Sequence, residues 1–544
     1  MVRVCGVLAA WLGVAVSSGP AGCAEPAGAP AGRDESPTQW FRDGAAWVAR
    51  TKELARRSEH AKNLILFIGD GMGVGTVTAA RILEGQLRGE SGEENLLFFE
   101  GFPYTALVKT YNTDLQTPDS AGTMTAIVTG VKTRAGFLSV DQVPPRGSVD
   151  VDGHRLTTIL ELAEQAGLAT GVVTTTSVTH ATPGACYAHS PERRWEDDTL
   201  LTPEARAAGF RDIAAQLVES TVGDGIEVVF GGGRQHFCPI AWHDPEYPVL
   251  TGARQDGRDL TNEWLTKPNA AFVWNLKQFN AIQPDKVGHL LALFEPQHMR
   301  FEHDRKQDPG GEPSLSQMTA KAIEILSLGR RGFFLMVEGG RIDHAHHAAN
   351  AFRALTETIE FSNAVKTARG MTRDDDTLIV VTADHSHVMT ISGYAARGNP
   401  ILGKSTSALA LAAPGQVGRD ATGLPYATLS YANGPGYAGA SLEQPEGPKH
   451  APHYGTGFQP ARSRPDLSSV DTTAPEYLQE CMVPMPAETH SGEDVPLYAD
   501  GPGASLFHGV IEQNVIFHVC VEALGLKAVA PKPRHVTPEA KPKP

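Results

Sequence analysis

Four apolar runs in this 544-residue chain each end in side chains that can bind a metal ion. The runs are "KNLILFIGDGMG" (62–73), "ATGVVTTTSVTHATP" (169–183), "GFFLMVEGGRIDHAHH" (332–347) and "DTLIVVTADHSH" (376–387). Continuous apolar runs bounded by glycine are typical of strands that are buried on both faces of a parallel sheet. Segments with a helical pattern, such as 75–87 and 155–167, lie between them. The sequence therefore predicts an α/β fold, with a central, mostly parallel sheet flanked by helices on both faces.

The polar side chains at the ends of these runs are Asp70, His180, Thr182, Glu338, Asp343, His347, Asp384 and His385. In α/β folds, ligands bind beyond the carboxyl ends of the strands. One Asp after a strand is most often a turn residue or a helix cap, but four strands ending in this way are much less expected by chance. Asp343 and His347 are four residues apart and could hold one ion from one face of a helix. Asp384 and His385 could reach a second ion.

The kind of ligand indicates the kind of metal. Mixed oxygen and nitrogen ligands suit zinc, whereas an all-oxygen set suits magnesium. The remaining histidines of these segments, His344, His346 and His387, are expected to support the ligands or to be structural.

Charge and composition narrow the class of partner. The net charge of −15 argues against nucleic acid, because a phosphate-binding surface needs a basic stripe. It does not exclude a small anionic substrate in a pocket that contains cations. Apolar residues make up 41% of the chain, which is enough for a large core.

The N-terminal segment has the pattern of an export signal. Arg3 precedes a short apolar run, 4–16, which suits a signal peptide better than a membrane span. Residues 1–23 are predicted to be a leader that is cleaved after small residues or lipidated at Cys23. Residues 24–38 are predicted to be a flexible tether. The protein is then exported, and is periplasmic, extracellular or lipid-anchored to the cell surface or outer membrane.

Two further features concern the rest of the chain. Residues 526–544 are rich in Pro and Lys and are predicted to be a disordered tail. The cysteines after the leader form no CxxC pair, so a cysteine-based zinc site is not expected. Export would permit disulfides among them, which the sequence leaves open; they are Cys186, Cys238, Cys481 and Cys520.

Five motifs together resemble the alkaline phosphatase family. They are "NLILFIGDGMG", "PDSAGTMTA", "VEGGRIDHAHH", "TADHSH" and "ETHSGED", which follow one another in the family's order over residues 62–494. "GGGRQHF", "LFEPQHM" and "NGPGY" strengthen the likeness to the animal-type enzymes. An exported or lipidated form would be of bacterial type. The resemblance implies one catalytic domain over 39–525, a crown-like insertion at about 393–485, and a homodimer.

The resemblance also implies two zinc ions and one magnesium ion. The first zinc would be held by Asp343, His347 and His490. The second would be held by Asp70, Asp384 and His385, facing Ser120. Magnesium would be held by Asp70, Thr182 and Glu338, together with water.

Three further roles follow from the resemblance. Arg193 matches the arginine that grips phosphate, although its neighbour Arg194 is one step away and Trp195 has to fix the register. His180 would lie near the magnesium without ligating it. Asp119 would orient Arg193, or would be only a solvated turn residue.

A weaker match suggests a peripheral calcium site. Glu246, the carbonyl of Phe294 and Glu295 match the animal-type ligands, and Glu312 or Asp308 would complete the set. Calcium takes 6–8 oxygen ligands, so these groups and water would suffice. Ordinary surface carboxylates are the alternative.

The implied activity is hydrolysis of phosphate monoesters through a phosphoserine at Ser120. Two cations can stabilise both the attacking and the leaving oxygen of an in-line displacement. A serine at a helix start is also well placed, because exposed N–H groups and the helix dipole favour a phosphoserine there.

Three other functions are compatible with parts of this pattern. A sulfatase would carry a Cys or Ser in a C/S-x-P-x-R context, which "DSAGT" lacks. A phosphodiesterase of the same superfamily would be distinguished by its turnover of diesters. A non-catalytic metal- or phosphate-binding protein would be expected to lose Ser120 or Arg193, and both are present.

Overall fold

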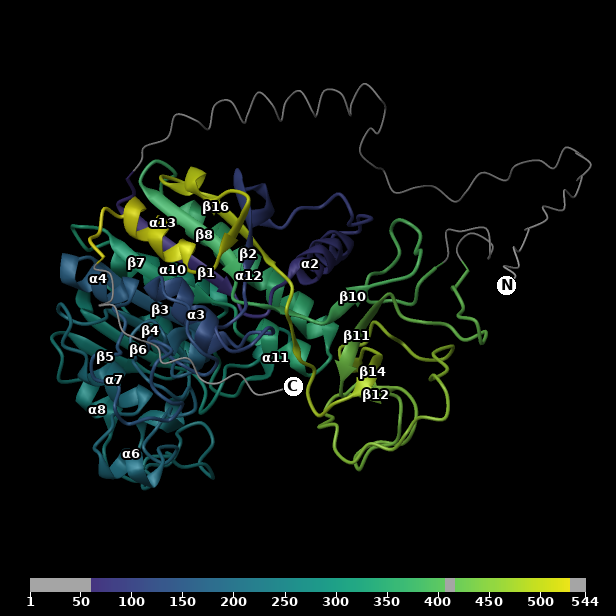
Figure 1. Cartoon of the computed structure of the whole chain (residues 1–544), viewed down its shortest axis with the longest axis horizontal. Coiled ribbons are helices and arrows are strands. Elements are labelled where there is room, and N and C mark those ends of the chain that lie inside the picture. The colour runs from purple at the N-terminus through teal and green to yellow at the C-terminus, as the bar shows by residue number, and fades with distance from the viewer. Residues whose placement is uncertain (1–59, 407–415, 529–544) are drawn as a thin grey trace, which may run out of the picture.

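The computed structural model describes residues 60–406 and 416–528 (Figure 1). The predicted leader, Cys23, the tether and residues 529–544 of the predicted tail lie outside the described residues. None of the helices within the described ranges combines the length and hydropathy needed to cross a bilayer.

Ten strands form one central sheet in the order β17-β2-β16-β8-β1-β7-β3-β4-β6-β5. β16 is antiparallel to its neighbours β2 and β8, and the other strand pairs are parallel. The strands are β1 Asn63–Gly69, β2 Tyr104–Lys109, β3 Ala169–Ser177, β4 Val228–Gly232, β5 Ala270–Val273, β6 His289–Leu293, β7 Phe333–Glu338, β8 Thr377–Ala383, β16 Val495–Asp500 and β17 Val510–Glu512. The predicted mostly parallel sheet is confirmed.

The four apolar runs form the four adjacent strands β8, β1, β7 and β3. Their registers align the ends: Ile68 lies opposite Glu338, and Gly69 lies opposite Ala383. The apolar side chains of β1 are at most 1% exposed, because helices cover both faces. Four parallel strands therefore deliver their following polar residues to one edge of the sheet.

Two groups of helices contact the sheet. α2, α10 and α12 pack together and reach β1, β3 and β7, whereas α3, α4, α5 and α13 form a second group around β3 and β7. The helices are α2 Val74–Leu87, α3 Ser120–Thr129, α4 Ile159–Ala166, α5 Ala181–Gly184, α6 Pro203–Ala207, α7 Ile213–Glu219, α8 Leu260–Trp264, α9 Leu276–Ala281, α10 Leu315–Leu326, α11 Arg341–His347, α12 Ala351–Met371 and α13 Val515–Ala523. The predicted helices at 75–87 and 155–167 correspond to α2 and α4.

The predicted insertion folds beside the central sheet rather than into it. Figure 1 shows its small strands at the lower right, away from the central sheet. A three-stranded sheet joins β10 (Met389–Ile391), β11 (Leu429–Gly434) and β14 (Cys481–Pro484). A separate pair joins β12 (Lys449–His450) and β13 (Tyr477–Leu478).

A short strand pair closes the insertion back onto the sheet. β9 (Ser386–His387) follows β8, and β15 (His490–Ser491) pairs with it in antiparallel register, with His490 opposite His387. This pairing returns His490 to the sheet edge where β8 ends. The four cysteines that follow the leader are buried, and no disulfide joins them within the described part of the chain.

The amino-terminal end of β3 carries a buried carboxyl group. Glu164 of α4 is 3% exposed. Its Oε1 accepts a hydrogen bond from the Thr170 hydroxyl at 2.5 Å, and its Oε2 accepts one from the Gly225 N–H at 3.2 Å. Burial raises the pKa of Glu164 to about 7, although the Thr170 hydrogen bond lowers it.

Glu164→Gln is therefore expected to flatten the pH dependence of stability. Between about pH 4.5 and 7 the folded chain holds a proton on Glu164 that the unfolded chain has released, so the free energy of unfolding falls as pH rises through this window. The side chain of the glutamine variant cannot titrate. Its free energy of unfolding should therefore decrease less over this window, by up to about 3 kcal/mol, than that of the parent. Denaturant unfolding of both proteins from pH 5 to pH 8 measures this, with exposed Glu204→Gln as the control. Parallel curves for Glu164→Gln and the parent would contradict it.

Candidate active site

Helix α3 presents Ser120 at its first turn. Asp119 is the N-cap, and its Oδ1 accepts a hydrogen bond from the Gly122 N–H at 3.1 Å. Ser120 is 2% exposed, and its Oγ lies 3.1 Å from Nε2 of His385. The cap is thus Asp119, which leaves the hydroxyl of Ser120 facing the residues that follow β8.

The first cluster contains the three residues predicted for the first zinc. Asp343 and His347 share one face of α11, and Nε2 of His347 lies 3.3 Å from Oδ1 of Asp343. Nε2 of His490 lies 3.3 Å from the same oxygen and 3.2 Å from Nε2 of His347. Residues that are 143 positions apart in the chain therefore direct three ligand atoms at one point.

The second cluster contains the residues predicted for the second zinc. Nε2 of His385 lies 3.3 Å from Oδ1 of Asp70 and 3.3 Å from Oδ2 of Asp384. All three side chains are fully buried. Because Ser120 Oγ contacts the same imidazole nitrogen, the serine faces this cluster.

The third cluster contains the residues predicted for magnesium. Asp70 also belongs here, with Glu338 at the end of β7 and Thr182 in α5. Four buried oxygen atoms at this place have no hydrogen-bond partner among the described residues: Oδ1 and Oδ2 of Asp70, Oγ1 of Thr182 and Oε1 of Glu338. Buried polar atoms are normally paired, and a group of oxygen atoms of this kind suits a cation.

The spacing of the first two clusters fits zinc. Tetrahedral ligands at Zn–N and Zn–O distances of about 2.0–2.1 Å lie about 3.3 Å from one another. The observed separations of 3.2–3.3 Å agree with this value. The third cluster offers oxygen atoms, which suits a hard cation such as magnesium.

Two of the buried carboxyl groups in these clusters have raised pKa values. Burial, followed by the charge of Asp384, raises the pKa of Asp70 well above its usual value. Burial raises the pKa of Glu338 to about 7, even though hydrogen bonds from threonines lower it. Carboxyl groups that resist ionisation this strongly in isolation are stabilised as anions by a bound cation.

His387 and Glu488 support the first cluster; His387 was expected to support ligands or to be structural, whereas Glu488 was not singled out from the sequence. Nε2 of His387 lies 2.7 Å from Oδ1 of Asp343, and its Nδ1 lies 2.5 Å from Oε2 of Glu488. Burial alone would lower the pKa of His387, but these two carboxylates raise it to about 10. Glu488 stands two residues before His490 in the motif "ETHSGED". This place in the motif was the only feature of the sequence that pointed to Glu488.

Arg193 lies beside the serine helix. Its NH1 donates to Oδ2 of Asp119 at 3.1 Å, and its NH2 donates to Nε2 of His180 at 3.1 Å. Arg194 is exposed, and Trp195 is buried at 2% exposure. The structure thus brings Arg193 together with Asp119, which was predicted to orient it or to be a turn residue, and with His180, which was predicted only to lie near the magnesium.

The predicted calcium ligands form a separate cluster. Carboxylate oxygens of Glu246, Glu295 and Asp308 lie within 4.8 Å of one another, and Phe294 directly precedes Glu295. Glu312 is outside this group, and its Oε1 accepts a hydrogen bond from the Arg300 N–H at 2.9 Å. Of the two alternatives left open by the sequence, the geometry brings Asp308 to the cluster.

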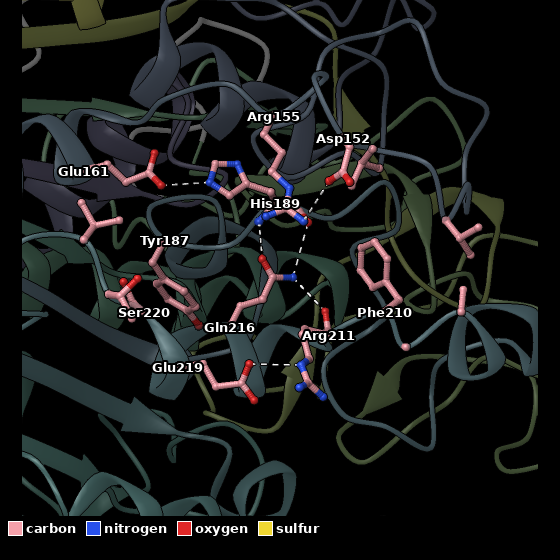
Figure 2. Close-up of a pocket in the computed structure, with 16 residues that line it drawn as sticks. Asp152, Arg155, Glu161, Tyr187, His189, Phe210, Arg211, Gln216, Glu219 and Ser220 are labelled. Atoms are coloured by element: carbon pink, nitrogen blue, oxygen red, sulfur yellow. Dashed lines mark hydrogen bonds and ion pairs between the residues drawn. The ribbon is translucent and has the colours of Figure 1, made fainter.

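A polar pocket of about 430 Å³ lies elsewhere, on α4, α7 and the segments around them (Figure 2). His189 lines it: its Nδ1 donates to the carbonyl of Ser139 at 2.9 Å, and its Nε2 lies 3.0 Å from Glu161. Figure 2 also shows the Gln216 amide, which donates to the backbone carbonyl of Arg211 at 2.8 Å, and the Arg211 guanidinium, which pairs with Glu219 at 3.2 Å. No residue of the three metal clusters lines it, so it is not the reaction site.

Comparisons with known proteins decide the family. The alkaline phosphatase family model matches residues 61–526. This chain belongs to the alkaline phosphatase family. The tissue-nonspecific alkaline phosphatase of Gallus gallus is 44% identical over 519 residues, covering 94% of this chain and 93% of that protein. The alkaline phosphatase of Gadus morhua is 43% identical over 489 residues, which cover 88% of this chain and 95% of that protein. The chain is therefore a metal-dependent phosphomonoesterase, and the predicted family and activity are confirmed.

Solved alkaline phosphatases share the fold. The enzyme of Thermus thermophilus has a TM-score of 0.60 at 25% identity, covering 87% of this chain and 93% of that one. A variant of the TAB5 enzyme with Mg bound in its M3 site has a TM-score of 0.56 at 22% identity, and the match covers 87% of this chain and 100% of that one. The predicted alkaline phosphatase-like α/β fold is thus confirmed.

His490→Ala tests the first cluster, because it removes one of three ligand atoms and leaves Asp343 and His347. We expect the variant to lose about one equivalent of zinc per chain during dialysis, and added zinc to restore part of its turnover. Metal analysis by mass spectrometry, with turnover measured on the same samples, checks this. Exposed His508→Ala is the control and should keep the parent's metal content. Unchanged zinc and rate in His490→Ala would exclude His490 as a ligand.

Proposed function

We propose that this alkaline phosphatase transfers the phosphoryl group of a monoester first to Ser120 and then to water. The observation that carries the proposal is the contact between Ser120, at the first turn of α3, and His385 of the second cluster. Asp119, the N-cap of the same helix, accepts a hydrogen bond from Arg193. The nucleophile, the ligand clusters (here called cages) and the phosphate-binding arginine (the clamp) thus belong to one site.

We assign one zinc to Asp343, His347 and His490 and a second zinc to Asp70, Asp384 and His385. Magnesium is assigned to Asp70, Thr182 and Glu338. When bound, such ions lower the pKa of an attached hydroxyl or water and neutralise charge on the attacking and leaving oxygens. Two observations support this assignment: the ligand atoms of the first two clusters have the spacing of tetrahedral zinc ligands, and four buried oxygen atoms of the third cluster have no hydrogen-bond partner among the described residues.

Ser120 performs the attack. Its Oγ forms a bond to phosphorus as the ester oxygen leaves with its electron pair and becomes the alcohol. The phosphoserine would then lie at the N-terminus of a ten-residue helix, where free N–H groups and the helix dipole stabilise its negative charge. Water then attacks the same phosphorus, releases inorganic phosphate and regenerates the serine.

Arg193 holds the phosphoryl oxygens during both steps. Asp119 and His180 each accept one of its N–H groups, which fixes the plane of the guanidinium and leaves further N–H groups to donate to phosphate. Asp119 also caps α3, so one carboxylate sets the position of both the nucleophile and the clamp.

A fourth ion, calcium, is proposed for Glu246, Glu295 and Asp308 with the carbonyl of Phe294. The convergence of three carboxylates supports it. Arg234 and Arg300 already pair with two of these carboxylates, at 3.0 Å to Glu246 and 2.9 Å to Glu295, so calcium would share the cluster with these cations.

The remaining proposals concern the protein's setting. We propose export by the 1–23 leader, with Cys23 as a possible lipid anchor, and one catalytic domain over 39–525 with the insertion at about 393–485. We also propose a homodimer. Exposed apolar side chains in the insertion support an interface there: Leu442 is 82% exposed, Met482 is 76% exposed and Tyr454 is 71% exposed.

Ser120→Ala is expected to lower turnover of a chromogenic phosphomonoester by more than about a hundredfold, because the route through a phosphoserine requires its hydroxyl. Zinc content should remain nearly unchanged, since the hydroxyl contributes little to a cage of two carboxylates and an imidazole. Ser327→Ala, on the exposed end of α10, is the control. A variant that kept more than a few per cent of the activity would show that Ser120 is not the nucleophile.

Arg193→Ala is expected to weaken inhibition by inorganic phosphate more than it slows turnover. A lost charged hydrogen bond costs about 1.5–3 kcal/mol, which is about tenfold to somewhat over a hundredfold in affinity. The matched variant Arg194→Ala should have little effect, because that side chain is exposed. If only Arg194→Ala raised the inhibition constant for phosphate, the clamp would be Arg194.

A further inference from the structure

Three imidazole rings from different parts of the chain meet beside the phosphate clamp. The ring centroids of His298 and His344 are 4.4 Å apart, those of His180 and His298 are 5.4 Å apart, and those of His180 and His344 are 5.6 Å apart. His180 follows β3, His344 lies in α11, and His298 lies in the loop after β6. The contacts of His180 with both other rings are edge to face.

Each ring accepts a hydrogen bond from a group that can only donate. Nδ1 of His298 accepts from the Ser177 N–H at 3.0 Å. Nδ1 of His344 faces NH1 of Arg341 at 2.8 Å, and Nε2 of His180 faces NH2 of Arg193 at 3.1 Å. All three imidazoles are therefore neutral, and each carries its proton on the other ring nitrogen.

The orientation of His180 depends on its ring neighbours. Its Nδ1 makes no hydrogen bond to a described protein group, so Nε2 is the ring atom through which the described protein groups hold it by a hydrogen bond. A turned ring would present carbon in place of Nε2 to Arg193. The rings of His298 and His344 restrict this motion by packing against it, and each is fixed in turn by its own donor.

We propose that His298 is a positioning residue for phosphate binding: its ring holds His180 with Nε2 toward Arg193, and so holds the guanidinium in the plane that grips phosphate. The inference rests on the proposed role of Arg193. It concerns His298 because this residue approaches from a loop that supplies no zinc or magnesium ligand, whereas His344 adjoins Asp343.

The test compares inhibition by inorganic phosphate in single and double variants. His298→Ala is expected to raise the inhibition constant about three- to tenfold, the scale of losing one aromatic ring contact, while kcat changes less. His298→Phe keeps a ring and should restore most of the affinity. Gln297→Ala, which alters the exposed neighbour, is the control.

A double variant separates positioning from direct contact with phosphate. If His298 acts through His180, then adding His298→Ala to His180→Ala should produce no further increase in the inhibition constant. The same three- to tenfold increase in both backgrounds would overturn the inference, as would a His298→Ala protein with unchanged phosphate inhibition. Arg193→Ala is measured alongside: if it leaves phosphate inhibition unchanged, the proposed clamp itself has failed, whatever the His298 variants do.

Discussion

The concentration of buried negative charge at one edge of the sheet is the constraint on which the rest of this structure depends. Asp70, Glu338 and Asp384 follow or end adjacent parallel strands, and the registers bring them together without freedom to move apart. Burying carboxylates costs free energy unless cations accompany them. Bound cations would offset this cost at the edge of the sheet, and in a metal-dependent phosphomonoesterase the same ions would supply the reactivity that a phosphate monoester needs.

A second consequence of the proposed assignment is that the residues assigned to the metal ions and those assigned to phosphate binding share their supporting side chains. Asp119 caps the serine helix and orients Arg193, while His387 links Asp343 to Glu488. Because each of these side chains has two tasks, a change that appears structural will alter chemistry as well. The neutral imidazoles around His180 extend the same principle to the clamp, where packing sets the direction of a hydrogen bond.

The sequence predicted the parts of the site that are local. The runs that became β1, β3, β7 and β8 were continuous and apolar, and Asp343 and His347 lie one helical turn apart. The sequence did not reveal the contacts that depend on pairing between segments far apart in the chain. His490 was assigned only by resemblance, and its position follows from the pairing of β15 with β9. Glu488, His298 and the choice of Asp308 over Glu312 depend on loops whose course no local pattern specifies.

The central claim is that three neighbouring clusters each hold one cation, and anomalous diffraction tests it most directly. Crystals of the purified enzyme measured on either side of the zinc absorption edge should show two strong peaks, one among Asp343, His347 and His490 and one among Asp70, Asp384 and His385. The position among Asp70, Thr182 and Glu338 should carry density without a zinc signal. A single zinc peak, or zinc peaks away from these side chains in an active enzyme, would contradict the account.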